Sequence, residues 1–350
     1  MTYNILNYRN GTNYCTGNNN SSSAKEAGIA TIVNYVQPDI IVFNEVGSNA
    51  NNPTYLLNNA LNTNGTTSWA TTTYTHNGFS SLVNTIAYNS ERFDVADQWT
   101  IDKDVNGNSL TRIIDVVHFH MIDSLANPAS WWDTTDFYII AAHFKAGNTT
   151  ADAATRGLEA EAIMDWIDNN LNTSLDINVF LLGDLNTYSS SEPAYAALTA
   201  GAGYRLEDPI NSSGNWHNNS SFAGIHTQST STASSGCKSG GGLDDRLDHI
   251  LISETVGEGD RYLTYAPNTY MAVGNDGNHF NNAINSGTNY SATSAVISAL
   301  ATVSDHLPVI LDVDVFWSFD LEESASMHLN LPNPARTGQH ITLPASATAE

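Results

Sequence analysis

Short apolar runs, each next to a polar side chain, are the feature that most limits what this chain can fold into. Ile40–Phe43 precedes Glu45, and Leu181–Gly183 precedes Asp184. Runs of this length between turn-forming residues are typical of buried β-strands. Apolar residues at helical spacing lie between them, at 24–35, where Ser23 is the candidate N-cap, and at 151–171. Alternation of such strands with helices predicts an α/β domain.

Six expected strands share one property, which is a polar or acidic residue at or near one end. The strands are Tyr3–Tyr8, Ile40–Phe43, Phe137–Ala142, Val179–Leu182, Asp248–Ile252 and Pro308–Val313. The polar residues are Asn7, Glu45, His143, Asp184 with Asn186, Asp248, and Asp305 with His306. One such residue alone is most often a satisfied loop side chain. Ligand sites of α/β sheets gather at strand ends, however, so six in register with strands predict a common site.

Three of these side chains are candidate metal ligands. Glu45, Asn7 and Asp305 offer carboxylate and amide oxygens, the hard ligands that suit Mg²⁺, Mn²⁺ or Ca²⁺. A divalent ion held there would polarise a phosphoryl oxygen and stabilise the leaving oxyanion. We expect Mg²⁺ or Mn²⁺ as the cofactor, with Ca²⁺ as an alternative structural or supporting ion.

The remaining side chains are candidates for proton transfer and for contacts to phosphate. His306 is a candidate acid or phosphate donor, and a nearby Asp248 would fix its tautomer and raise its pKa. Asp184 would orient or deprotonate the attacking water, while Asn186 would donate to a phosphate oxygen. His143 is a second candidate acid, base or phosphate donor. Together these roles predict the hydrolysis of a phosphoester.

The balance of charge argues against a protein that binds nucleic acid by electrostatics alone. The 350 residues contain 12 Lys and Arg against 36 Asp and Glu, a net charge of −24. No broad basic face is available for phosphate backbones, but a hydrolase can hold one phosphate with a metal ion and a few local cations. Charged residues make up 14% of the chain, against roughly 25% in an average domain. The Asn, Thr, Ser and Gly that replace them favour an extracellular protein.

Cysteine content and hydropathy also bear on location. Cys15 and Cys237 are the two cysteines; in an exported chain they would form a disulfide, and two buried thiols are the alternative. No apolar run reaches the length needed to span a membrane. Met1 leads directly into the strand-like run at Tyr3, so we expect that any export signal has been removed from this sequence.

Six segments in this chain resemble, in order, those of the endonuclease/exonuclease/phosphatase superfamily, which includes DNase I, abasic-site endonucleases, sphingomyelinases and inositol-polyphosphate phosphatases. They are Tyr3–Asn7, Pro38–Val46, Ala142–Phe144, Gly183–Asn186, Arg246–Leu251 and Ser304–Val309. Each is weak alone, but the ordered set, above all Gly-Asp-x-Asn followed by Ser-Asp-His-x-Pro-Val, is specific. The resemblance covers nearly all of residues 1–315. It implies a four-layer α/β/β/α sandwich of two packed mixed sheets flanked by helices.

The resemblance also implies roles for the matched residues. Glu45 would be the principal metal ligand, with Asn7 and Asp305 at or near the metal, and Asp248 would pair with His306. These roles agree with the chemistry expected from the residue types.

Two matches are less regular. Arg112, in Leu110–Ile113, looks like the family's phosphate-contacting arginine, and an ordinary solvated arginine is the alternative. His143 matches the histidine of the DNase I-like and sphingomyelinase-like branches. DNase I-like members have a glutamate partner for that histidine, but the strand at Asn84–Tyr88 offers Asn84 or no clear match. The role of His143, and membership of the DNase I branch itself, therefore stay open.

The end of the chain differs in character. After Phe316 the strand pattern fades, and Asn333-Pro334-Ala335 followed by Gly338 resembles the beginning of the C-terminal sorting domain of type IX secretion in Bacteroidetes. We expect a catalytic domain at 1–315 and, at 316–350, a linker with the truncated start of a sorting domain. This tail predicts the export machinery as a partner and an extracellular or cell-surface location.

These observations favour an extracellular nuclease that hydrolyses DNA by metal-assisted attack of water, with RNA as a second candidate substrate. The first alternative is a phosphoesterase of the same fold acting on phospholipid head groups or small phosphate esters. Trp131-Trp132 would suit a lipid-directed loop, although packing within a loop is the simpler interpretation. A non-catalytic binding module is disfavoured because every expected catalytic residue type is present. We expect a monomer.

Overall fold

Two six-stranded β-sheets form the centre of the computed structural model, which describes residues 1–122, 135–201 and 203–315. The first sheet has the order β12 (Met271–Ala272), β13 (Val309–Ile310), β1 (Thr2–Tyr8), β2 (Ile40–Gly47), β4 (Leu82–Asn89), β3 (Trp69–Thr71). The second has the order β5 (Phe93–Lys103), β6 (Ser109–Met121), β7 (Asp136–His143), β8 (Val179–Asp184), β10 (Asp248–Ser253), β9 (Leu206–Glu207). A separate ribbon pairs β11 (Leu263–Tyr265) with β14 (Val313–Val315). Both large sheets are mixed, since β1–β2 and β7–β8 are parallel and their other pairs antiparallel.

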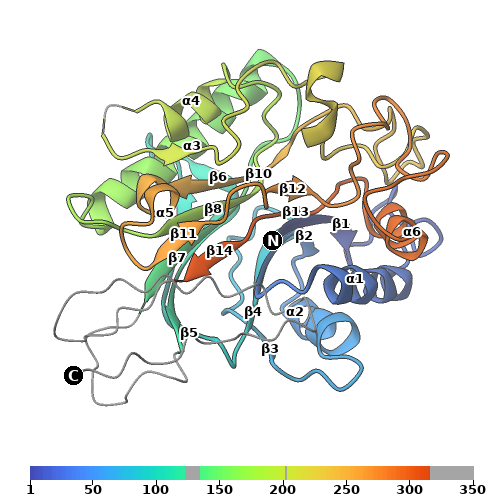
Figure 1. The fold of residues 1–350 in the computed structure, drawn as a ribbon, viewed down its shortest axis with the longest axis horizontal. Helices are drawn as coiled ribbons and strands as arrows, with labels where there is room; N and C mark the ends of the chain where they lie inside the picture. The colour runs from blue at the N-terminus through green and yellow to red at the C-terminus, as the bar shows by residue number, and fades with distance from the viewer. Residues whose placement is uncertain (123–134, 202, 316–350) are drawn as a thin grey trace, which may run out of the picture.

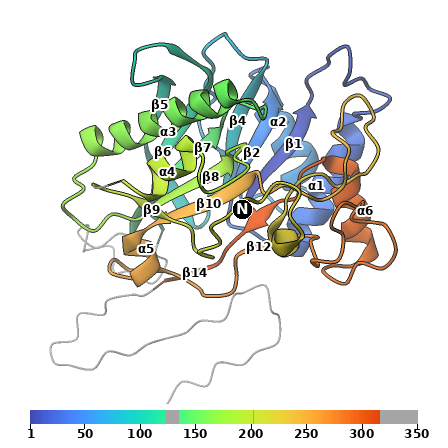
Figure 2. The ribbon, with the colours of Figure 1, turned by 90° about the horizontal axis from the view of Figure 1, so that it is seen from above.

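Helices flank the two sheets on their outer sides (Figures 1 and 2). The first sheet carries α1 (Ser22–Val36), α2 (Asn52–Leu56), the short η1 (Leu57–Leu61) and α6 (Ser294–Val303). The second carries α3 (Thr150–Asn170) and α4 (Pro193–Thr199), while α5 (Glu254–Glu258) follows β10 and η2 (Ser220–Ile225) lies in a loop. The predicted four-layer α/β/β/α sandwich is therefore confirmed. The helices predicted at 24–35 and 151–171 are α1 and α3, and their ends differ from the prediction by one or two residues. The N-cap of α1 is Ser21, whose hydroxyl accepts from Ala24 N, and not Ser23 as predicted.

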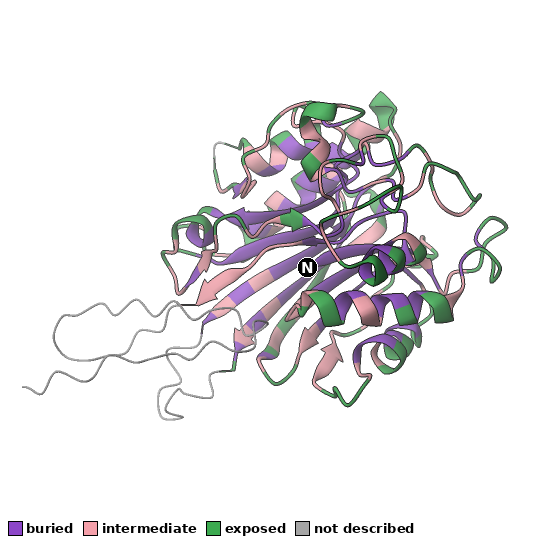
Figure 3. Cartoon of the chain, turned by 45° about the vertical axis from the view of Figure 1, so that its right-hand side comes forward, coloured by how far each residue is buried: buried purple, intermediate pink, exposed green. Residues whose placement is uncertain are grey.

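Period-two alternation along the strands builds three apolar layers between the four structural layers. Val42 of β2 and Phe180 of β8 point into the layer between the two sheets. Their neighbours Ile41 and Leu181 point the other way, toward the helices on the first and second sheet respectively. Successive side chains of a strand point to opposite faces of the sheet, so a continuous apolar run indicates a strand that is buried on both faces. Figure 3 shows this burial along the central strands.

Strand pairing brings together motif residues that are far apart in the sequence. In the register of the second sheet, His143 of β7 lies opposite Asp184 of β8, and Asp184 lies opposite Asp248 of β10. One expectation was wrong: the run Pro308–Val313 is not a single strand. It divides into β13, which pairs with β1, and β14, which pairs with β11.

A disulfide joins two loops of the described chain, one after β1 and one before β10. Cys15 and Cys237 are bonded, with Cα atoms 4.6 Å apart and 222 residues between them in the sequence. Asn19 Nδ2 also donates to the carbonyl of Ser235 at 3.1 Å. The disulfide therefore holds the loop that follows β1 against the loop that precedes Asp248.

Two sequence-based expectations fall on other parts of the chain. The linker and sorting segment at 316–350 and the pair Trp131-Trp132 lie outside the described residues. Among the described helices, none combines the length and hydropathy required to cross a membrane.

Removal of the disulfide by the double variant Cys15→Ser/Cys237→Ser is expected to lower the free energy of unfolding by about 2–4 kcal/mol, because the crosslink limits the unfolded chain. Urea unfolding of the variant and of the unmodified, disulfide-bonded protein measures the difference. The unmodified protein after reduction should match the variant. Equal midpoints with and without the crosslink would contradict the prediction.

Candidate active site

Several site residues adopt left-handed backbone conformations at strand ends. The φ angles are +49° at Asn7 in β1, +61° at Glu45 in β2 and +51° at Asn186 after β8. The pairing of β1 with β2 shifts register between Asn4 and Tyr8, so both strands are irregular where these residues lie. Left-handed conformations are uncommon for residues other than glycine and cost free energy, and a cluster of them is typical of a functional site. The sequence suggested that Glu45 follows its strand, but Glu45 lies within β2.

Asparagine side chains hold the Glu45 carboxylate. Asn7 donates to Glu45 Oε2 from its backbone N at 2.9 Å and from Nδ2 at 3.2 Å. Asn4 Nδ2 donates to Glu45 Oε1 at 3.2 Å and to Asp184 Oδ2 at 2.9 Å. Asn4 thus links a carboxylate of the first sheet to one of the second sheet. Asn7 was predicted from the sequence and Asn4 was not, although Asn4 belongs to the same Tyr3–Asn7 segment.

The glycine of the Gly-Asp-Leu-Asn segment lets Asp184 approach its neighbours. A Cβ on Gly183, where φ is +152°, would lie 1.8 Å from the carbonyl oxygen of Ala142. No other residue fits between β7 and β8 at that point. Beyond it, Asp184 Oδ1 accepts from the backbone N of Asn186 at 3.0 Å. The Asn186 side chain donates to the carbonyl of Phe144 at 3.2 Å.

His306 and Asp248 form a buried pair, as the sequence predicted. His306 Nδ1 lies 2.8 Å from Asp248 Oδ2, and Nε2 lies 3.8 Å from Asp184 Oδ2. Burial by itself lowers the pKa of His306, but the carboxylates of Asp248 and Asp184 outweigh it and raise the pKa well above its usual value. The ring therefore carries a proton that its Nε2 can donate toward Asp184 or toward a ligand.

Asp184 lies at the centre of an acidic cluster. Burial raises its pKa to about 7; His306 opposes the shift, and Asp248 and Glu45 add to it. Among the described residues, Glu45, Asp184 and Asp248 lie next to histidines and form no ion pair with Lys or Arg. Three carboxylates without a permanent cation favour a bound divalent ion.

The donor set fits such an ion. Ligand atoms of Asp184, Asp248 and His306 lie within 4.8 Å of one another, but a protonated His306 has no lone pair to offer, so the carboxylate oxygens are the candidate ligands. Asp248 Oδ1 is buried and has no hydrogen-bond partner in the described part of the chain. A buried acceptor without a partner is costly, and a hard cation would satisfy it.

His143 lies beside both carboxylates that Asn4 links. Its Nε2 is 3.6 Å from Asp184 Oδ2 and 4.0 Å from Glu45 Oε1. Burial, with Arg112 and His306 adding to it, holds the pKa of His143 well below its usual value, so the ring is neutral. Nδ1 is buried and has no hydrogen-bond partner among the described residues. His143 thus lacks a carboxylate partner on Nδ1, which agrees with the departure seen in the sequence.

Arg112 and Asp305 have other partners. Arg112 Nη1 donates to the carbonyl of Phe144 at 3.1 Å and to that of His143 at 3.4 Å. The half-buried guanidinium thus lies beside the end of β7. Asp305 Oδ2 accepts from the backbone N of Ser239 at 2.7 Å, in the disulfide-bonded loop. Asp305 is not in the group of Asp184, Asp248 and His306, whose ligand atoms lie close together.

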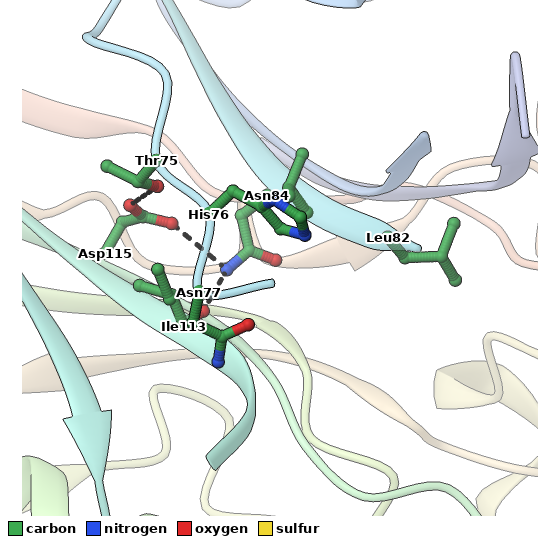
Figure 4. A pocket seen from close by; sticks show the side chains of 8 residues that line it. Thr75, His76, Asn77, Leu82, Asn84, Ile113 and Asp115 are labelled. Atoms are coloured by element: carbon green, nitrogen blue, oxygen red, sulfur yellow. Dashed lines mark hydrogen bonds between the residues drawn. The ribbon is translucent and has the colours of Figure 1, made fainter. Parts of the chain in front are cut away.

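A line of buried hydrogen bonds supports Asp184 from the first sheet. The backbone N of Asp184 donates to Asn44 Oδ1 at 3.0 Å, and Asn44 Nδ2 donates to Asn84 Oδ1 at 2.9 Å. Asn84 Nδ2 lies 3.3 Å from Asp115 Oδ2, and Thr75 Oγ1 donates to Asp115 Oδ1 at 2.5 Å. Figure 4 shows the Thr75–Asp115–Asn84 part of this line at the edge of a small pocket. Asn84, the candidate partner of His143, therefore uses its side-chain oxygen to bind Asn44 and its side-chain nitrogen to bind Asp115.

The fold and these side chains define a class: an α/β sandwich with a buried His–Asp pair facing carboxylates, suited to hydrolysis of a phosphoester. The Endonuclease/Exonuclease/phosphatase family matches residues 1–306, so the chain belongs to this family of phosphoester hydrolases, which typically depend on a divalent metal. The resemblance drawn from the six segments is thereby confirmed. No curated protein sequence matches the chain.

Solved structures support the fold at low sequence identity. An endonuclease/exonuclease/phosphatase family protein from Bacteroides thetaiotaomicron is 15% identical, with 93% of this chain and 96% of that chain covered and a TM-score of 0.56. D. rerio TDP2 complexed with single-strand DNA product is 11% identical, with 90% and 97% covered and a TM-score of 0.53. A B. thetaiotaomicron mannosyl-6-phosphatase is 13% identical, with 90% and 98% covered and a TM-score of 0.51. At these identities the likeness shows a shared fold.

The variant Asp115→Asn is expected to flatten the pH dependence of stability. Burial raises the pKa of Asp115 to about 7, against 3.8 for the unperturbed group. The folded state therefore binds more protons between these values, and the stability that this group contributes is present below the lower value and lost as pH rises through the upper one. An asparagine can donate to Thr75 and accept from Asn84 without titrating.

Urea unfolding at about pH 5 and about pH 8 measures this effect. The free energy of unfolding of Asp115→Asn, relative to that of the unmodified protein, should be higher at about pH 8 than at about pH 5. Asp102→Asn, at an exposed position of β5, is the matched control. An Asp115→Asn difference that is the same at both pH values would contradict the buried, protonated carboxyl.

Proposed function

We propose that this protein is an extracellular, divalent-metal-dependent phosphodiesterase and that DNA is its principal substrate, with RNA as a further one. The observation that carries the proposal is the buried pair of His306 and Asp248 facing Asp184. Next to it lies Glu45, held by Asn7 and Asn4. This arrangement combines a proton donor, a proton acceptor and oxygen ligands for a metal within one strand-end cluster.

Glu45 and Asn7 would hold the metal ion. Both lie at the irregular end of the β1–β2 pair, and Glu45 is the more exposed carboxylate of the cluster. Asp305, predicted as a third ligand, would act at longer range because its Oδ2 already accepts from Ser239. A bound Mg²⁺ or Mn²⁺ would supply charge to the phosphoryl oxygens as negative charge develops.

His306 and Asp184 have separate roles: His306 donates a hydrogen bond to the phosphate, and Asp184 accepts a proton from the attacking water. Asp248 fixes the His306 ring through Nδ1, which leaves the Nε2 proton for a non-bridging phosphate oxygen. Asp184, whose pKa of about 7 leaves it partly ionised near neutral pH, accepts the proton of the attacking water through its carboxylate. Asn4 and the backbone of Asn186 hold this carboxylate in place. Neutral His143 offers a further nitrogen beside Asp184.

DNA is proposed as the substrate because hydrolysis of one phosphodiester needs positive charge near that phosphate and not a broad basic surface. A net charge of −24 weakens long-range attraction of a polyanion, but local metal and histidine charge is sufficient for one phosphate at a time. The similar D. rerio TDP2 structure contains a single-strand DNA product, which supports a nucleic-acid substrate on this fold. The similar mannosyl-6-phosphatase makes small phosphate esters the alternative to be tested beside DNA.

Export is proposed from three features. The Cys15–Cys237 disulfide is of a kind that persists in oxidising compartments. The low share of charged residues and the tail after Phe316 agree with it. The expected partners are thus nucleic acid as substrate and the export machinery through the tail.

Incubation with supercoiled plasmid and Mg²⁺ or Mn²⁺ is the first test of function. Nicking is expected with metal and not with chelator, and His306→Ala should lose on the order of 100-fold or more of the rate because a proton donor and phosphate contact disappear. His76→Ala, at a histidine whose Nε2 bonds to the carbonyl of Ser80, is the matched control. No nicking, together with metal-dependent hydrolysis of small phosphate esters, would exclude the nuclease and retain the mechanism.

Glu45→Gln is expected to raise the Mg²⁺ concentration for half-maximal activity more than about tenfold, since a charged ligand becomes neutral. Calorimetric titration of Mg²⁺ without substrate should show the same loss of affinity. Glu91→Gln, at an exposed carboxylate, serves as the control. An unchanged Mg²⁺ dependence would show that Glu45 does not hold the metal.

A further inference from the structure

Gln228 lies in a segment that the motifs of the sequence did not include. Its backbone N donates to the carbonyl of Asp245 at 3.1 Å, and its carbonyl accepts from the backbone N of Asp244 at 2.8 Å and of Asp245 at 2.9 Å. These bonds attach the segment to the chain that leads into β10. The position of Gln228 is therefore set by its backbone and not by its side chain.

The adjacent residue attaches the same segment to Asp248 and to Leu307, the residue that follows His306. Thr227 Oγ1 accepts from the backbone N of Asp248 at 3.2 Å, and the Thr227 carbonyl accepts from the backbone N of Leu307 at 2.7 Å. Isolated bridges also link Gln228 with Asp245 and with His306. The segment thus runs between the residues that flank Asp248 and those that flank His306.

The Gln228 side chain contacts the imidazole nitrogen that Asp248 leaves free. Its amide nitrogen Nε2 lies 2.7 Å from His306 Nε2, while His306 Nδ1 is bonded to Asp248. An amide nitrogen can only donate, so this contact suits a ring that is protonated on Nδ1 alone; when His306 Nε2 also carries a proton, the amide turns over and accepts through its oxygen. This nitrogen is the one that faces Asp184, at 3.8 Å. In the proposed reaction the same nitrogen contacts the phosphate, so the amide occupies the place of a phosphate oxygen.

Side-chain nitrogens of three neighbouring residues are bonded to the protein. Asn186 Nδ2 and Arg112 Nη1 both donate to the carbonyl of Phe144. Asn4 Nδ2 donates to two carboxylates. Gln228 is the amide whose bond to His306 must change when a phosphate arrives.

We propose that Gln228 is a substrate-contacting residue whose side-chain amide leaves His306 Nε2 when the phosphodiester binds and then donates to a non-bridging oxygen of the same phosphate. The inference rests on the proposed function. Arrival of the phosphate exchanges one hydrogen bond of His306 for another and leaves the amide N–H beside the phosphate. The segment's backbone bonds remain in place throughout.

The chemistry of an amide suits this position. Glutamine both donates and accepts, so it can pair with His306 while the site is empty and with an anionic oxygen when it is filled. A lysine there would instead pair with Asp184 or Asp248, and a glutamate would repel the phosphate. A neutral donor therefore adds affinity for phosphate without blocking the acidic cluster.

The test compares Gln228→Met with the unmodified protein, using bis(4-nitrophenyl) phosphate and Mg²⁺. Methionine keeps the length of the side chain and removes its hydrogen bonds. The turnover number should fall about 10- to 100-fold, as expected for loss of a hydrogen bond to a charged group. The inhibition constant of inorganic phosphate should rise by a similar factor. Gln228→Glu should lose more activity than Gln228→Met because of repulsion.

Two controls separate contact from structure. Gln98→Met, at a glutamine whose amide bonds to the backbone of Thr73, should leave turnover and phosphate inhibition unchanged. Circular dichroism and the thermal midpoint should show that Gln228→Met is folded, since the backbone bonds of that segment do not involve its side chain. Gln228→Asn, which retains an amide, should recover part of the lost activity.

Several results would overturn the proposal. Tighter phosphate inhibition with unchanged or faster turnover in Gln228→Met would show that the glutamine only covers His306. Unchanged constants would show that it makes no contact. Should the unmodified protein hydrolyse no phosphoester, the proposed function fails, and calorimetric binding of inorganic phosphate still tests the contact: weaker binding by Gln228→Met would support it, and equal or absent binding would overturn it.

Discussion

The pairing of β8 with β7 on one side and β10 on the other is the constraint on which the site depends. It sets Asp184 between His143 and Asp248, three residues contributed by separate parts of the chain. The pairing requires a residue without a side chain at Gly183, where the backbone of Ala142 leaves no space. Because strands in a sheet hold their register through many backbone hydrogen bonds, this geometry is rigid before any ligand is present.

Charge then decides what the rigid geometry can bind. Glu45, Asp184 and Asp248 meet without Lys or Arg partners in the described residues, and burial raises the pKa of Asp184 to about 7. Such a cluster opposes its own ionisation, so a divalent cation and a protonated His306 are the charges that complete it.

The two sheets cooperate through asparagine side chains. Asn4 joins Glu45 to Asp184, and Asn44 joins the backbone of Asp184 to Asn84 and so to Asp115. Amides suit the interface because each donates and accepts, so that buried polar groups are satisfied without further charge. Packing of the two sheets is thereby coupled to the position of the carboxylate proposed to act on water.

The sequence alone determined the α/β class, most of the strands near the site and the segments that carry Glu45, His143, Asp184, Asp248 and His306. It did so because burial on both faces leaves continuous apolar runs, and strand ends leave polar residues at readable spacing. It did not reveal Asn4, Asn44 or Gln228 as site residues, since an asparagine or glutamine in a strand or loop has many uses. Nor did it show that Asp305 bonds to Ser239, or that Asn84 serves Asp115 rather than His143. Only the tertiary structure decided these partners, because they depend on how two sheets and distant loops pack in space.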